Sequence, residues 1–146
     1  MLCVRLNPNV HTAQLTVTPN PESMETVTDF LSDALEKWAV PTKRAHKAQI
    51  GADEIYSNIV RYSGAHTATL TVTDDGAQVT LRFCDDGKPY DPTAAKAPDL
   101  TRSADEREIG GLGIFVVKKT AAKFDYAYRD GENHLTVVFT DAEGSR

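Results

Sequence analysis

The segment Glu54-Ile55-Tyr56-Ser57-Asn58 decides the fold, because two later segments complete it. The first is Asp85-Asp86-Gly87-Lys88-Pro89, and the second is Gly110-Gly111-Leu112-Gly113-Ile114. A carboxylate and an amide one helical turn apart are followed by an acidic turn after a strand, and then by glycines that open a helix. This order of segments predicts a nucleotide site on a scaffold of helices and strands.

The composition predicts one soluble domain. The chain has 146 residues, is 40% hydrophobic and 25% charged, and carries a net charge of −5. The absence of a basic block argues against direct binding of nucleic acid. No apolar run is long enough to span a membrane, and Met1-Leu2-Cys3-Val4-Arg5-Leu6 does not resemble a signal peptide. We therefore expect a cytoplasmic protein that makes no membrane contact.

Cysteines and histidines predict no metal site of their own. Cys3 and Cys84 are far apart in the sequence and are expected to be reduced thiols. The histidines are scattered, and none stands at metal-ligand spacing from another ligand type. They are His11, His46, His66 and His134.

Hydrophobic periodicity predicts an α/β (α+β) two-layer sandwich, in which a mixed, mostly antiparallel sheet is covered on one face by three helices. Asn20-Pro21-Glu22 is typical of a helix start. The expected strands are Leu2–Leu6, Ala13–Thr18, Thr67–Thr73, Gln78–Cys84, Phe124–Arg129 and His134–Thr140, and the expected helices run from Asn20 to Trp38, from Lys43 to Tyr62 and from Leu112 to Lys123. The whole chain, residues 1–146, is expected to form one domain, with a lid loop at about residues 86–109.

Glu54 and Asn58 project from the same side of their helix. On their own, such residues commonly belong to a solvated helix face. As a site, an amide oxygen suits Mg²⁺, and a nearby carboxylate can deprotonate the group that attacks a γ-phosphate.

Asp85 closes a strand shortly before Gly87. Asp-Asp-Gly is a common turn sequence, and a turn alone would explain this segment. The functional alternative is a buried carboxylate that accepts a hydrogen bond from the adenine amino group, with Gly87 letting the backbone pass close to the base.

Gly110, Gly111 and Gly113 precede a helix. Glycines are common in loops without any binding role, but at a helix start they expose N–H groups to an anion. Their spacing matches neither a Walker loop nor a dinucleotide fingerprint, and a dinucleotide oxidoreductase is excluded by the order of the motifs.

Together the three segments resemble the N, G1 and G2 boxes of the Bergerat-fold ATPases. Among these, the chain is most similar to the anti-sigma factor serine/threonine protein kinases, which have a histidine-kinase-like ATPase domain. Arg82–Pro92 contains the D-x-G-x-P-[FY]-D-P pattern, and Glu106–Ile114 contains the E-R-x-I-G-G-L-G-I pattern. Tyr126–Thr136 resembles the closing hairpin of that family.

The resemblance implies ATP and Mg²⁺ as cofactors and assigns the roles. Glu54 would be the catalytic base, Arg107 a cation of the lid, and Asn58 the Mg²⁺ ligand. The residues implied to hold the nucleotide are Asn58, Asp85, Gly87, Pro89, Gly110, Gly111, Leu112 and Gly113. Arg107 could equally be a solvated residue among the acids around it.

The resemblance also implies a partner-switching pathway. The phosphoacceptor would be a STAS-domain anti-anti-sigma protein, a sigma factor is a second possible partner, and the kinase would form a homodimer. The alternative is a nucleotide-regulated binding protein with little or no kinase turnover. A degenerate domain that takes no nucleotide is disfavoured because all three boxes are intact.

Overall fold

The computed structural model describes residues 9–92 and 111–142 of the chain. The expected strand at Leu2–Leu6 and most of the expected lid loop lie outside these ranges. Within them, the elements are β1 (His11–Val17), α1 (Ser23–Lys37), α2 (Thr42–Asn58), the π-helix η1 (Ile59–Ser63), β2 (Ala68–Asp74), β3 (Gln78–Asp85), α3 (Gly111–Thr120), β4 (Lys123–Arg129) and β5 (Glu132–Thr140).

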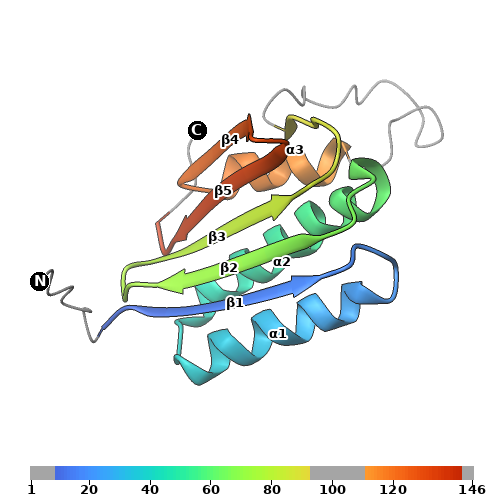
Figure 1. Cartoon of the computed structure of the whole chain (residues 1–146). Helices are drawn as coiled ribbons and strands as arrows, with labels where there is room; N and C mark the ends of the chain where they lie inside the picture. Colours follow the sequence, from blue (N-terminus) through green and yellow to red (C-terminus); the bar gives the residue numbers. More distant parts are fainter. Residues whose placement is uncertain (1–8, 93–110, 143–146) are drawn as a thin grey trace, which may run out of the picture.

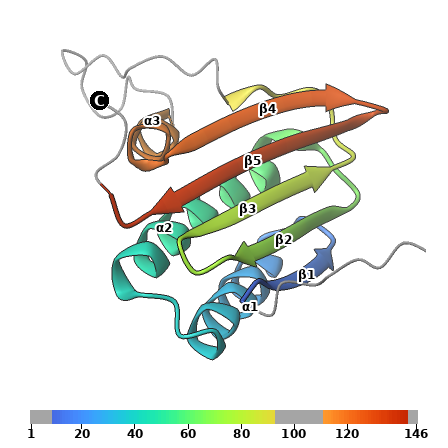
Figure 2. The ribbon, with the colours of Figure 1, turned by 90° about the vertical axis from the view of Figure 1, so that its left-hand side faces the viewer.

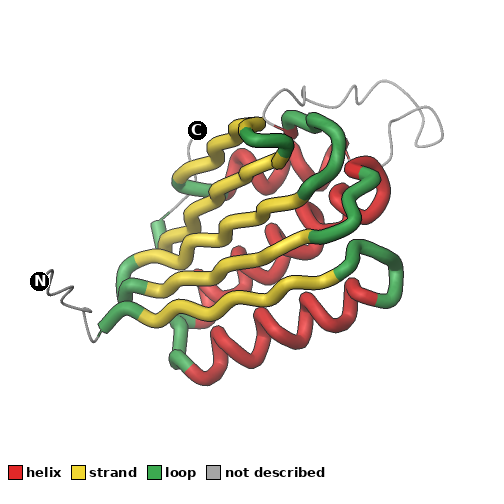
Figure 3. The backbone as a smooth tube through the Cα atoms, in the orientation of Figure 1, coloured by secondary structure: helices red, strands yellow, loops and turns green. Residues whose placement is uncertain are grey.

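The strands form one sheet in the order β1-β2-β3-β5-β4. All four described pairings are antiparallel, so the described sheet contains no parallel pair. The three α-helices lie on one face of the sheet, and no described helix or strand covers the other, open face (Figures 1, 2 and 3). The expected two-layer α+β sandwich is therefore confirmed, with an antiparallel rather than a mixed sheet among the described strands.

The core fills the space between the sheet and the three α-helices. Burial alternates along β2 and β3, so that every second residue faces the helices, as a half-buried sheet requires. Phe139 is fully buried, and a Cβ added to Gly51 of α2 would lie 2.5 Å from Cζ of this ring. Gly51 therefore lets α2 approach β5 closely, in the middle of the core.

Two reciprocal hydrogen bonds lie at the start of α1. The amide N–H of Ser23 donates to Oδ1 of Asn20 at 2.8 Å, and the amide N–H of Asn20 donates to Oγ of Ser23 at 3.1 Å. The regular helix begins at Ser23, three residues after the predicted Asn20, and its N-cap is Glu22, which makes no side-chain cap bond. The bonds between Asn20 and Ser23 instead close the Pro21-Glu22 turn that precedes the helix. Ser23 Oγ also lies 2.6 Å from the buried hydroxyl of Tyr56, which ties α1 to α2.

The end of the second helix differs from the prediction of a regular helix to Tyr62. The α-helix stops at Asn58, and one π-helical segment, Ile59–Ser63, follows. Gly64, with φ of 64°, ends it. The wider turn places the carbonyl of Ser63 where it accepts the amide of Lys88 at 2.9 Å. A tertiary hydrogen bond thus accompanies the change in helix type, and periodicity carries no signal of it.

The third helix ends three residues before the predicted Lys123. Its last residue is Thr120, and the amide of Ala122 donates to the carbonyl of Val138 at 2.8 Å. This bond draws the chain into the sheet, so Lys123 belongs to β4. Among the described residues, no helix combines the length and the apolar composition that a membrane span requires.

Candidate functional site

One pocket lies where the end of α2 and η1 meet the end of β3 and the start of β5. It encloses about 390 Å³ of space, part of which is open solvent. Its walls are Ile55, Asn58, Ile59, Ser63, Phe83, Asp85, Tyr90, Pro92, Ile114, Tyr126, Asn133 and Leu135. The pocket thus brings together residues of the first two predicted segments, Asn58 and Asp85, and α3 from the third.

Asn58 is the buried polar residue of the pocket that points most directly to a ligand site. Its side chain is 3% exposed, yet neither Oδ1 nor Nδ2 has a hydrogen-bond partner among the described residues. Buried polar groups are nearly always hydrogen-bonded, because leaving one unpaired costs about 1–3 kcal/mol. An oxygen-seeking cation or a polar ligand in the pocket would remove this cost.

Glu54 lies one turn before Asn58 on α2 and is half-buried. A Cβ added to Gly113 would overlap with Oε2 of Glu54, so the first turn of α3 runs directly against this carboxylate. A larger residue at position 113 would have to push this flexible carboxylate aside. Glu54 therefore faces the helix start at which the glycine segment is expected to hold an anion.

Asp85 is 5% exposed at the end of β3. Its Oδ1 accepts two hydrogen bonds of 3.0 Å, from the amide of Gly87 and from Nδ2 of Asn133. Burial raises the pKa of Asp85, and the bonds from Asn133 and Gly87 oppose this rise. Oδ2 has no partner among the described residues, so one acceptor oxygen remains available for a donor in the pocket.

Gly87 is fixed by a backbone contact. A Cβ at this position would overlap with the carbonyl oxygen of Ser63, so the turn after β3 approaches η1 closely. Asp86 anchors the same turn from outside, because its Oδ1 accepts the amides of His66 and Thr67 at 2.7 and 3.0 Å. These bonds lower the pKa of Asp86.

Asn133 is a site residue to which sequence reasoning assigned no role. Besides Asp85, its Nδ2 donates to the carbonyl of Lys88 at 2.8 Å, and its Oδ1 accepts the amide of Tyr90 at 3.0 Å and the hydroxyl of Tyr126. Asn133 thereby fixes both the carboxylate and the chain that follows β3. Its pairing with Asp85 across β3 and β5 depends on strand register, which only the structure supplies.

The remaining predicted residues fall in three groups. Pro89 is exposed and is not among the residues that line the pocket. Gly111 begins α3, and Leu112 follows it. Gly110 and Arg107 lie outside the described residues, so the predicted phosphate loop and lid cation stay predictions.

Comparison with known proteins identifies the family. Residues 17–139 match the family described as the histidine kinase-like ATPase domain. The chain belongs to this family. The resemblance drawn from the three sequence motifs is therefore confirmed, and nucleotide use is the property that the family description implies for the pocket.

A relative and a solved structure are similar to this member of the family. The serine/threonine-protein kinase BtrW of Bordetella bronchiseptica (strain ATCC BAA-588 / NCTC 13252 / RB50) is 38% identical over 98 residues, which are 64% of this chain and 69% of the relative. The structure of the RsbU and RsbW domains of Rv1364c from Mycobacterium tuberculosis has a TM-score of 0.60 at 11% identity. That match covers 93% of this chain and 33% of the solved chain, so the chain spans about a third of the solved one. At this identity, the likeness shows the fold alone.

Proposed function

We propose that the protein is an ATP-dependent serine/threonine protein kinase of a partner-switching pathway. The observation that carries the proposal is the buried amide of Asn58, without a partner among the described residues, one helical turn from Glu54 and in the same pocket as Asp85. The expectation of a protein serine/threonine kinase is borne out by the likeness to BtrW, a named serine/threonine-protein kinase.

The residues present fit ATP and Mg²⁺. The Asn58 amide oxygen is a hard donor of the kind that Mg²⁺ accepts, and the ion keeps waters in its other positions. Asp85 Oδ2 would accept a hydrogen bond from the adenine amino group, while the amide of Gly87 holds the other oxygen of that carboxylate. The bound nucleotide supplies the γ-phosphoryl group.

Glu54 is proposed as the catalytic base. It would accept the proton of the attacking serine or threonine hydroxyl as that oxygen bonds to phosphorus. The contact with Gly113 sets the position of the carboxylate relative to the first turn of α3. The amides at this helix start would face the phosphates, where the helix dipole favours negative charge.

The partners are also part of the proposal. The phosphoacceptor is proposed to be a STAS-domain anti-anti-sigma protein, a sigma factor is proposed as a second partner, and the kinase is proposed to act as a homodimer. The support is the motif resemblance to the anti-sigma factor kinases. A cytoplasmic location belongs to the same proposal, because the reaction needs ATP and the described cysteine, Cys84, is a free thiol.

The test is transfer of radiolabelled phosphate from ATP to STAS proteins encoded in the same genome. Glu54→Gln should keep Mg-ATP and lose transfer, whereas Asn58→Ala should lose magnesium-dependent binding as well. Asp53→Asn is the matched control, because Asp53 is an exposed acid on the same helix. Transfer by Glu54→Gln at the wild-type rate would contradict the base assignment. Mg-ATP binding without transfer to any STAS protein would favour the alternative of a nucleotide-regulated binding protein.

A further inference from the structure

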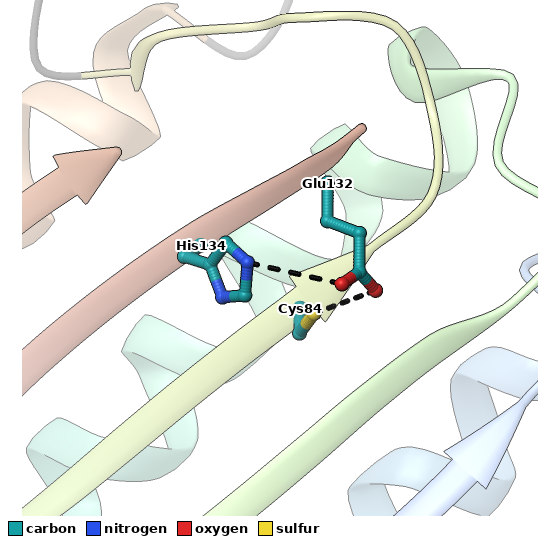
Figure 4. A group of neighbouring side chains, drawn as sticks. All are labelled: Cys84, Glu132 and His134. Carbon is teal, nitrogen blue, oxygen red and sulfur yellow. Dashed lines mark hydrogen bonds and ion pairs between the residues drawn. The ribbon is translucent and has the colours of Figure 1, made fainter. Parts of the chain in front are cut away.

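The open face of the sheet carries a group of metal-ligand side chains. Cys84 of β3 is paired directly with His134 of β5, and Glu132 lies two residues before His134 on the same face. Figure 4 shows the three side chains turned toward one another. Their nearest neighbours in the sequence, Asp85 and Asn133, point to the opposite face and line the pocket.

The donor atoms of the three residues lie close enough to share one ion. Cys84 Sγ is 3.2 Å from Oε2 of Glu132, and Nε2 of His134 is 4.0 Å from Oε1 of Glu132. Choosing one ligand atom from each residue, all of them lie within 4.8 Å of one another. In a tetrahedral zinc site, bonds of about 2.3 Å to sulfur and about 2.0 Å to nitrogen or oxygen separate the ligand atoms by roughly 3.3–3.6 Å. Side-chain adjustments of about an ångström or less would therefore close the site.

We propose that Cys84, Glu132 and His134 bind one Zn²⁺ ion on the open face of the sheet, with water as the fourth ligand. A thiolate, an imidazole and a carboxylate form a donor set that zinc accepts, and the sulfur disfavours Mg²⁺. The Zn–S bond replaces the S–H bond, and the proton goes to solvent. The neutral imidazole and the ionised carboxylate each contribute a lone pair.

The surroundings leave these ligands available. The side chains of His134 and Glu132 are 23% and 44% exposed, so an ion can reach them from solvent. Among the described residues, the thiol of Cys84 has Glu132 as its hydrogen-bond partner, and this bond already orients both groups. Burial and then the hydrogen bond to Glu132 raise the pKa of the Cys84 thiol to about 11, so a metal ion must displace the thiol proton as it binds.

The three proposed ligands come from two strands, β3 and β5, that are far apart in the sequence. Cys84 and Glu132 are 48 residues apart, which is why ligand spacing along the chain gives no sign of the site. Sequence reasoning expected no metal role for the cysteines or the histidines, and strand register brings one of each together. Because these side chains lie on the face opposite the pocket, the zinc site can be tested without reference to nucleotide binding.

The experiment is a titration of the full-length, untagged and reduced protein with Co²⁺, without nucleotide and with Mg²⁺ in excess. Tetrahedral Co²⁺ bound through sulfur should give visible absorption bands and a sulfur-to-metal charge-transfer band in the near ultraviolet. One equivalent should saturate both signals, and Zn²⁺ should then displace the cobalt. Calorimetry with Zn²⁺ gives the affinity directly.

Variants assign the ligands. Cys84→Ser should remove the charge-transfer band, and Cys84→Ser and His134→Ala should each weaken Zn²⁺ binding by more than about tenfold, because each removes one of three ligands. Cys3→Ser and His46→Ala are the matched controls and should bind as the wild type does. Circular dichroism checks that each variant is folded. Failure to saturate at one equivalent, or Cys84→Ser with unchanged affinity, would overturn the proposal.

Discussion

Gly113 and Glu54 are in direct contact across the start of α3, because a Cβ at position 113 would overlap with Oε2 of the glutamate. A motif glycine is usually explained by its backbone amide or its φ angle. Here its lack of a side chain also leaves room for a carboxylate of another helix to lie against the backbone. The third predicted segment of the sequence is thus joined to the first by a contact and not only by order.

Gly113→Ala should impair phosphate transfer more than folding. The new methyl group must displace Glu54 or the first turn of α3, and a displaced base loses transition-state stabilisation. We expect transfer to fall by about tenfold or more, equivalent to about 1.4 kcal/mol. Alanine also favours the helical backbone by roughly 0.5–1 kcal/mol relative to glycine, so the melting temperature should change little.

Thr120→Ala is the control for Gly113→Ala. It lies at the far end of the same helix, where its hydroxyl bonds only to backbone carbonyls of α3 among the described residues. Its transfer rate should equal that of the wild type. A Gly113→Ala protein that transfers phosphate at the wild-type rate would show that Glu54 tolerates displacement, which is incompatible with a positioned base.

Gly87→Ala should weaken both the fold and ATP binding. The methyl group meets the carbonyl of Ser63, a backbone atom that cannot rotate away, and such overpacking costs about 1–3 kcal/mol. The strain would move the turn that also holds Oδ1 of Asp85 through the Gly87 amide. Chemical denaturation measures the first effect, and calorimetry with ATP measures the second.

Gly64→Ala separates these two effects. Gly64 has φ of 64° and no atom within 4 Å of an added Cβ, so alanine there adds only backbone strain, about 1–2 kcal/mol. It should therefore lose a comparable amount of stability and keep the wild-type affinity for ATP. Equal loss of affinity in the two variants would mean that ATP binding reports stability and not the Gly87 contact.

Local chemistry explains which parts of the fold could be predicted from the sequence. The hairpin at Asp74-Asp75-Gly76 and the turn at Asp130-Gly131 need residues that accept positive φ, and Gly76 and Gly131 have φ of 91° and 77°. Such turns depend on a few neighbouring residues, so the local sequence reveals them. The strand and helix boundaries set by alternation and by caps were correct to within a few residues for the same reason.

Features that depend on long-range pairing could not be predicted in this way. β5 lies between β3 and β4, and only this register places Asn133 opposite Asp85 and His134 opposite Cys84. The π-helical turn accompanies a bond between Ser63 and Lys88, which belong to different elements. The candidate site therefore divides into motif residues visible in the sequence and supporting residues visible only after folding.

Asp85→Asn should abolish the adenine contact while the fold survives. The amide oxygen of asparagine can still accept from Gly87 and Asn133, and this orientation turns its NH₂ group toward the pocket. Two donors would then face each other where adenine is expected. Losing a charge-assisted bond of about 1.5–3 kcal/mol implies roughly ten- to hundredfold weaker ATP binding.

Asp86→Asn is the matched control for Asp85→Asn. The neighbouring aspartate is exposed, and among the described residues its side chain accepts bonds only from the backbone amides of His66 and Thr67, which an asparagine oxygen can also do. Calorimetry with ATP should give the wild-type affinity for this variant. If Asp85→Asn also binds ATP as tightly as the wild type, Asp85 does not contact the base.

Arg44→Ala should be among the most destabilising substitutions outside the site. The guanidinium is 4% exposed, donates to the carbonyls of Gly76 and Ala77, and lies 3.8 Å from the buried carboxylate of Asp74. Removing it leaves that carboxylate buried without its cation, which typically costs about 3–5 kcal/mol. It also frees the β2–β3 hairpin from α2.

Asp141→Ala provides the contrast, because it removes the other carboxylate that pairs with Arg44. Asp141 lies 2.9 Å from Nη1 of Arg44, but its side chain is 50% exposed, and exposed ion pairs contribute about 0–1 kcal/mol. Urea denaturation of both variants gives the comparison, with the slope of the transition confirming that each unfolds in a similar way. Arg44→Ala should lose more free energy of unfolding than Asp141→Ala, because it also removes the buried pair with Asp74 and the two bonds to carbonyls. Similar midpoints for Arg44→Ala and Asp141→Ala would mean that the buried carboxylate is neutralised or solvated when the arginine is absent.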